Sequence, residues 1–257
     1  MNQYDAINKI TEAAIKDGLV DACFLKGSIA RGQEDKYSDV DLYFIVSNEN
    51  KDIFLKKRIQ YLETYQNILY YSFVNFVGPQ IVCIYENGLH VDLYTLTLDN
   101  INEYDNILVI HDPYEILKNY QAKPLSLTDS EIGKLINEFS YTLTEFYNAY
   151  KRKDLLFSFK LANYLHSDYT QLKRAFVDAN NSKIASKGFL KHLEGDELKQ
   201  YLNVTRLVKY DTSLVAVKML VILLNDLIIN LPISIAEHVN IDFFFFCKKL
   251  INSLNEE

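Results

Sequence analysis

The sequence contains no tryptophan and little glycine or proline, and each shortage restricts what the chain can form. Its 257 residues include only 8 glycines and 4 prolines, which argues against long flexible linkers and low-complexity segments. Without tryptophan, the 19 tyrosines and 15 phenylalanines must supply much of the apolar burial. A chain of this length is expected to fold as one large domain or two small ones.

Cysteines and long apolar runs are also scarce. Cys23, Cys83 and Cys247 are odd in number, far apart and without metal-ligand spacing, so we expect reduced thiols in the core of a cytoplasmic protein. The first 18 residues are amphipathic and mixed in charge, unlike a signal peptide. The longest apolar stretch, residues 214–224, includes Lys218 and is too short to span a membrane.

Basic residues are outnumbered by acidic ones, 27 to 34, which gives a formal net charge of −7. Because neutralising a nucleic-acid backbone requires a basic face, this balance disfavours a long nucleic acid as a partner. A small anion such as a nucleoside triphosphate is compatible with the chain if a cation accompanies it. The same acidity suits a polycationic small molecule, although it is a weak discriminator.

Hydrophobic periodicity divides the chain near residue 120. The first part predicts helices over 7–15 and 53–68, and strands over 21–25, 40–46, 71–76, 80–85, 90–97 and 107–110. From about residue 129 helical periodicity continues to the end, with breaks expected near residues 180–181, Gly188, Gly195 and Pro232. We therefore predict an α+β protein, with a mixed β-sheet domain over 1–120 followed by an all-α helical bundle over 121–257.

One stretch, LKGSIARGQEDKYSDVDLY at residues 25–43, places a Gly-Ser turn ten residues before two aspartates. Asp39 and Asp41 share one face of the predicted strand, about 7 Å apart. Two carboxylates at this distance repel each other unless a cation lies between or beside them. Oxygen ligands of this kind suit Mg²⁺, which takes one or two carboxylates and completes its shell with water and substrate phosphates.

The Gly-Ser turn supplies the groups that a phosphate needs. Gly27 lets the backbone approach closely, and the following N–H groups and the Ser28 hydroxyl can donate hydrogen bonds to an anion. Arg31 is either a phosphate ligand or a surface charge. Asp92, in the predicted strand HVDLYTLT, has apolar neighbours and so requires a partner. It can be a third metal ligand, a general base, or both.

The ordered combination resembles the signature of the nucleotidyltransferase superfamily, G-S-x10-D-x-D followed about fifty residues later by a strand aspartate. It is most similar to the antibiotic-modifying branch, and within it to the lincosamide nucleotidyltransferases. Those enzymes also place an acidic segment and Tyr-Ser before the metal carboxylates. The motifs carry the resemblance over residues 5–115, and the helical half matches as architecture alone.

The resemblance implies a function and a set of roles. A nucleotidyltransferase domain would transfer a nucleoside monophosphate, usually AMP from ATP, to a small-molecule hydroxyl and release pyrophosphate. Gly27 and Ser28 would contact the nucleotide phosphates. Asp39 and Asp41 would coordinate Mg²⁺, with Asp92 as third ligand, general base, or both. The first acceptor that the resemblance implies is a lincosamide. The helical half would line the acceptor cleft. The resemblance also implies a homodimer.

Other interpretations stay open. An aminoglycoside is the second acceptor class, and a protein-AMPylating enzyme of the toxin–antitoxin type is a rival, although such proteins are commonly minimal single domains. A non-catalytic nucleotide-binding module would be expected to lose a metal carboxylate, and none is missing. The motif also has a plain alternative, an ordinary turn before a strand in which Asp39 caps and Asp41 is solvated.

His90 and the run at residues 243–246 each have two interpretations. His90 either binds metal or orients Asp92, or it is a partly buried polar neighbour. Four consecutive phenylalanines cover all sides of a helix, so they indicate either core packing or a contact between two subunits.

Overall fold

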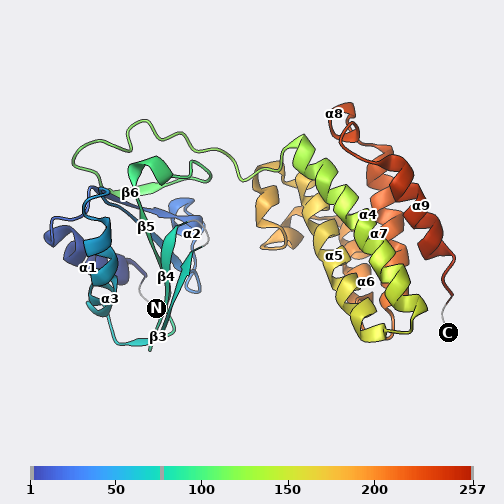
Figure 1. Cartoon of the computed structure of the whole chain (residues 1–257), viewed down its shortest axis with the longest axis horizontal. Helices are drawn as coiled ribbons and strands as arrows, with labels where there is room; N and C mark the ends of the chain where they lie inside the picture. Colours follow the sequence, from blue (N-terminus) through green and yellow to red (C-terminus); the bar gives the residue numbers. More distant parts are fainter. Residues whose placement is uncertain (1–2, 76–77, 256–257) are drawn as a thin grey trace. The chain divides into compact units, whose positions relative to one another are not determined.

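A change from sheet to helix divides the chain after residue 123. The structure, a computed structural model, describes residues 3–75 and 78–255 and separates into two units, Met1–Lys123 and Pro124–Glu257 (Figure 1). Each unit has a hydrophobic core of its own. The first combines a sheet with helices and the second is helical, which confirms the predicted α+β class.

The first unit is built on one mixed β-sheet. Its described strands are β1 (Ala22–Lys26), β2 (Val40–Ile45), β3 (Ile68–Asn75), β4 (Pro79–Tyr85), β5 (His90–Leu96) and β6 (Leu108–His111). Their order is β3-β4-β5-β2-β1-β6, and the central neighbours β2 and β5 run parallel while the other pairs are antiparallel. The strand predicted over 71–76 begins earlier, and its last residue, Phe76, lies outside the described residues.

Two helices, α1 (Gln3–Lys16) and α3 (Lys51–Glu63), cover one face of this sheet (Figure 1). Ile7, Ile10 and Ala14 recur at helical spacing on α1 and are buried. Leu25 and Leu42 point from the strands into the same core. Because strand side chains alternate, their sequence neighbours Lys26 and Asp41 lie on the opposite face.

The helix predicted over 53–68 is wrong at its C-terminal end. It stops at Glu63, and Ile68 already belongs to β3. The Thr64 hydroxyl donates to the Tyr61 carbonyl at 2.6 Å, a local bond that competes with continued helix. Ile68 then pairs with Tyr85 in the sheet, so strand pairing overrides the helical spacing of the sequence.

The face opposite α1 and α3 carries a row of stacked rings. Phe24, Tyr43 and Tyr94 are register neighbours on β1, β2 and β5, with centroids 5.0 and 4.2 Å apart. The segment after β5, which begins with the short 3-10 helix η1 (Leu98–Asn100), contributes Ile101 and Ile107 to this smaller cluster, and the segment after β6 contributes Leu117. Tyrosine and phenylalanine therefore supply the large aromatic rings of this cluster in a chain without tryptophan.

The second unit is a helical bundle. Its long helices are α4 (Asp129–Lys151), α5 (Leu155–Val177), α6 (Gly195–Leu207), α7 (Ser213–Ile229) and α9 (Ile241–Asn252), with the shorter η2 (Ala179–Ile184), η3 (Phe189–His192) and α8 (Ile233–Ala236) between them. In Figure 1, α4, α5, α7 and α9 run beside one another, and α4 packs on α5 and α9 while α5 packs on α7. Of the expected breaks, Gly188 and Pro232 lie between helices and Gly195 is the first residue of α6. Residues 180–181 lie within η2, where Asn181 departs from helical backbone angles.

The bundle also turns at places that the sequence pattern does not mark. The chain leaves α4 and enters α5 over residues 152–154 without glycine or proline. Lys153 takes a left-handed φ of 59° there, and the Asp154 carboxylate caps α5 by accepting from the Phe157 N–H at 3.2 Å. Aspartate is a common N-cap residue, and Asp154 was the signal for the start of α5. The sequence pattern did not mark the turn because no glycine or proline precedes this cap.

The phenylalanine run lies on α9 and splits between core and surface. Phe244 is fully buried and Phe243 packs against the core, whereas Phe245 and Phe246 are exposed.

Cys23, Cys83 and Cys247 are all free thiols and all buried, as expected. In the part of the chain that the structure describes, no helix is long and apolar enough to cross a membrane.

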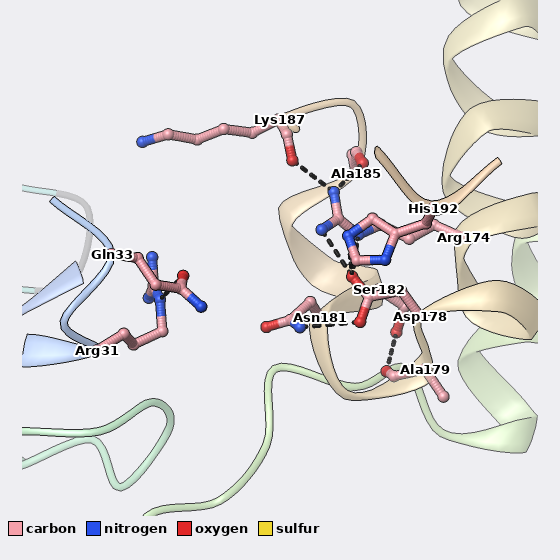
Figure 2. A network of polar contacts seen from close by, with 10 residues as sticks. All are labelled: Arg31, Gln33, Arg174, Asp178, Ala179, Asn181, Ser182, Ala185, Lys187 and His192. Atoms are coloured by element: carbon pink, nitrogen blue, oxygen red, sulfur yellow. Dashed lines mark hydrogen bonds and ion pairs between the residues drawn. The ribbon is translucent and has the colours of Figure 1, made fainter. Parts of the chain in front are cut away.

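A buried arginine fixes the irregular stretch after α5 (Figure 2). Arg174 donates to the Asp178 carboxylate at 2.8 and 3.1 Å, and to the carbonyls of Ala185 and Lys187 at 2.8 and 2.6 Å. His192 Nε2 lies 3.3 Å from the same carboxylate. Ala185 takes a left-handed φ of 47°, which costs about 1–2 kcal/mol in a residue with a Cβ. The network holds the loop in a conformation that it would not adopt alone.

Gly133 provides a test of the close packing between α4 and the residues after α8. An added Cβ would collide with the Cβ of His238 and lie 3.0 Å from its carbonyl oxygen. Glycine to alanine inside a helix normally stabilises it by about 1 kcal/mol. Here we expect Gly133→Ala to lower the free energy of unfolding of the helical unit by about 1–3 kcal/mol, measured by urea denaturation.

The matched control is Asn148→Ala at an exposed position of the same helix, which we expect to leave stability unchanged or slightly raised. A gain in stability for Gly133→Ala would contradict the close approach.

Candidate active site

Two of the expected acidic residues are direct neighbours across the parallel strand pair. Asp41 on β2 and Asp92 on β5 are register partners, so their side chains leave the same face of the sheet from backbones about 4.8 Å apart. Asp39 lies two residues before Asp41, immediately before β2 begins. The structure thus brings together residues that are about fifty positions apart in sequence on the face that α1 and α3 leave uncovered.

The negative charges of Asp39, Asp41 and Asp92 all affect the pKa values of His90 and Tyr94. A hydrogen bond to Asp92 raises the pKa of His90, and the negative charges of Asp92, Asp39 and Asp41 act in the same direction, against the opposing effect of burial. Burial raises the pKa of Tyr94 well above its ordinary value, and the same three carboxylates raise it further. Asp39 therefore contributes to the electrostatics of the face that Asp41 and Asp92 define.

His90 contacts one oxygen of Asp92. Its Nε2 lies 3.1 Å from Asp92 Oδ1, and the Asp92 side chain is 13% exposed. Because the His90 ring contacts this carboxylate directly, it restrains the orientation of the Asp92 side chain. His90 is thus a partly buried neighbour in contact with Asp92, and its functional role stays a prediction.

Gly27 and Ser28 follow β1 and lie beside Asp41. Gly27 takes a left-handed φ of 69°, and a Cβ on it would collide with the Asp41 carboxylate. Position 27 therefore requires glycine for two reasons, the left-handed backbone angle and the close approach of the Asp41 carboxylate. The Ser28 hydroxyl is buried and makes no hydrogen bond within the described residues. A buried hydroxyl of this kind needs a partner, which a ligand oxygen can supply.

The helix after Ser28 is shorter than the phosphate interpretation assumed. α2 (Gly27–Ala30) is a single turn, in which the Arg31 N–H donates to the Gly27 carbonyl at 3.2 Å. Such a turn carries little of the macrodipole of a long helix. Anion binding here depends on the backbone and hydroxyl donors of Gly27 and Ser28 and on nearby cations.

Arg31 follows α2 and forms an ion pair that the sequence did not reveal. Its Nη1 contacts the Asp105 carboxylate. Its Nε donates to Gln33 Oε1 at 3.2 Å, and Figure 2 shows these two side chains. Both members of the ion pair are mostly buried, with side chains 17% and 13% exposed. Asp105 lies in a loop with no motif, so only the folded chain identifies it as the partner.

Lys26 is a second cation that the sequence reasoning missed. It is the register partner of Asp41 on β1, and its Nζ donates to the carbonyls of Asn102 and Tyr104 at 2.5 and 2.8 Å. Burial lowers the pKa of Lys26 to about 8. A lysine that ends a buried strand immediately before Gly-Ser was the available signal, because buried lysines are rare without partners.

The donor set fits a hard divalent cation that completes its shell from a substrate. Within residues 3–75 and 78–255, no three His, Cys, Asp or Glu side chains are arranged to hold a metal ion by themselves. Asp41 and Asp92 nonetheless present carboxylates in register on one face. Mg²⁺ is typically bound by one or two carboxylates together with phosphate oxygens and water, so the two aspartates match what such an ion takes from a protein.

Comparison with known proteins identifies a family and finds matching chains among solved structures. The sequence profile of the family described as "Streptomycin adenylyltransferase" matches residues 1–243. Among solved structures, an aminoglycoside 6-adenyltransferase from Bacillus subtilis aligns with 97% of this chain and 96% of its own, at 14% identity and a TM-score of 0.40. A search of curated proteins finds no match.

Gly27 and Gly32 form a matched pair for testing whether the Gly27–Ser28 turn binds a nucleotide. Both take a left-handed φ, but a Cβ on Gly32 meets nothing within 4 Å, whereas one on Gly27 displaces Asp41. We expect Gly27→Ala to weaken Mg-ATP binding by about 30-fold or more, measured by calorimetry, and Gly32→Ala by no more than about threefold. Equal losses in the two variants would show that backbone strain, not the Asp41 contact, matters.

Proposed function

The chain belongs to the streptomycin adenylyltransferase family and is a nucleotidyltransferase, and on that premise we propose that it transfers AMP from ATP to a hydroxyl group of an aminoglycoside. The family description favours this acceptor over the lincosamide that the motif resemblance placed first. The net charge of −7 also suits a polycationic acceptor. The single observation that carries the proposal is the register of Asp41 with Asp92 beside the Gly27–Ser28 turn.

We assign the nucleotide to the first unit. Gly27 and Ser28 contact the phosphates, because the turn offers a close backbone and a hydroxyl that requires a partner. Asp39, Asp41 and Asp92 hold Mg²⁺, which when bound supplies positive charge against the negative charge that develops on the phosphates. Arg31 adds a guanidinium at the end of the same turn. The acceptor is left to the helical unit, over residues 124–257, whose side chains determine its recognition.

Asp92 also serves as the general base in this proposal. The acceptor hydroxyl oxygen forms a bond to the α-phosphorus, the bond from that phosphorus to the bridging oxygen breaks, and pyrophosphate leaves. The hydroxyl proton passes to the Asp92 carboxylate. His90, 3.1 Å from Asp92 Oδ1, holds that carboxylate in one orientation. Most of the rate enhancement then comes from positioning the two substrates, as expected for phosphoryl-type transfer.

The acceptor and the roles of the aspartates are tested together by mass spectrometry of reactions with MgCl₂, ATP and a panel of aminoglycosides and lincosamides. We expect an AMP adduct on an aminoglycoside such as streptomycin. Asp39→Asn, Asp41→Asn and Asp92→Asn should each reduce its rate on the order of 1000-fold, because each removes a charge at the reacting phosphates.

Asp99→Asn, at an exposed aspartate of η1, is the matched control and should retain full activity. An adduct confined to lincosamides would overturn the acceptor assignment, and an adduct that survives the three Asn variants would overturn the site. Binding of Mg-ATP without any small-molecule adduct would indicate a protein acceptor.

A homodimer, which the motif resemblance implies, is part of the proposal. Phe245 and Phe246 on α9 are 39% and 54% exposed and offer apolar contact area. We expect sedimentation velocity to show a dimer that the double change Phe245→Ser with Phe246→Ser converts to a monomer. A monomeric wild-type chain would contradict this prediction.

A further inference from the structure

One loop contacts Lys26 and Arg31, the residues that flank the Gly27–Ala30 turn α2. We call residues 102–105 the Asp105 segment. Lys26, before Gly27, donates to its Asn102 and Tyr104 carbonyls at 2.5 and 2.8 Å. Arg31, four residues after Gly27, forms its ion pair with the Asp105 carboxylate. The two cations that bracket α2 are therefore both bound to a segment about 75 residues away in the sequence, which no motif identifies.

The segment is anchored by contacts that do not involve Arg31. The Tyr120 hydroxyl donates to the Asp105 carbonyl at 2.8 Å. The Asp105 N–H donates to the Lys123 carbonyl at 2.9 Å, and the Lys123 N–H donates to the Glu103 carbonyl at 2.8 Å. Since Asp105 is fixed through its backbone, the ion pair orients the long arginine side chain on a rigid carboxylate.

The backbone of Asp105 adds a second observation. Its φ is 72°, in the left-handed region that residues with a Cβ rarely adopt. Such a conformation persists only where the surrounding contacts determine it, and it is common where a side chain must be aimed. The contacts to Tyr120 and Lys123 provide that constraint here.

Arg31 retains the capacity to bind a phosphate while it is held. A guanidinium has five N–H donors in a planar fork, and the bonds to Asp105 and Gln33 engage two of them. A side chain that is already ordered loses less conformational entropy when a ligand binds, which raises affinity. The buried ion pair is also screened by salt less than an exposed one.

We propose that Asp105 is a positioning residue for the nucleotide, because it holds the Arg31 guanidinium in place beside the Gly27–Ser28 turn. This inference rests on the proposed function, in which Arg31 contacts the triphosphate. It differs from competition, in which Asp105 would occupy Arg31 and the phosphate would have to displace it. The two arrangements predict opposite effects of removing the Asp105 charge.

The test is a double-mutant cycle on nucleotide binding by the full chain. Asp105→Asn, Arg31→Ala and the double variant are titrated with a non-hydrolysable ATP analogue and MgCl₂ by calorimetry. We expect Asp105→Asn to weaken binding by about tenfold in the wild-type background and to have no further effect when Arg31 is already alanine. A purely structural role would weaken binding equally in both backgrounds.

Glu103→Gln is the matched control, since it removes a carboxylate of the same segment whose pair with Lys123 is exposed. It should bind the analogue as the wild-type chain does. Tighter binding by Asp105→Asn would establish competition, and unchanged binding or an equal loss in both backgrounds would overturn the inference. No binding by the wild-type chain would instead overturn the proposed function, so the two failures are distinguishable.

Discussion

Two ionised aspartates in parallel register on one sheet face repel each other unless positive charge lies near them. Asp41 and Asp92 are placed in this way by the pairing of β2 with β5, and the polar groups around them follow from it. Lys26 is the register partner of Asp41 on the next strand, and His90 contacts Asp92. The chain belongs to the streptomycin adenylyltransferase family, and we propose that nucleotide transfer takes place at this pair. A divalent ion carried by a triphosphate would supply the charge that the protein alone provides only in part.

Strand alternation separates the stabilising residues from the reactive ones within a few positions. Val40 and Leu42 join α1 and α3 in the core, while Asp39 and Asp41 lie on the other face. The β3–β4 hairpin and α3 form the crossover that makes β2 and β5 parallel. The site therefore depends on the folding of residues 46–89, none of which carries a proposed catalytic group.

Much of the fold was predictable because local patterns encode it. The pattern of residues 21–46 and 90–97 predicted that Asp41 and Asp92 lie on strands and that Gly27 directly follows a strand, and the structure has them there. The roles of these residues stay predictions. Sequence could not reveal the partners that only tertiary structure brings together. Asp105 lies in a loop without periodicity, and α3 ends early because Ile68 joins a strand. The acceptor that we propose rests on the family description, because acceptor recognition depends on the shape of many side chains rather than on a spacing.

The three buried thiols have a practical consequence for studying the two units. Burial raises the pKa of Cys83 and of Cys247 to about 11, and that of Cys23 to about 12. At pH 8 a thiol with a pKa of about 11 is ionised in about one molecule in 1,000, and thiolates are the form that alkylating dyes attack. The native chain is thus already suited to selective labelling. One exposed cysteine introduced into each unit would carry a fluorophore pair, and energy transfer between the dyes would report their separation as nucleotide and acceptor bind.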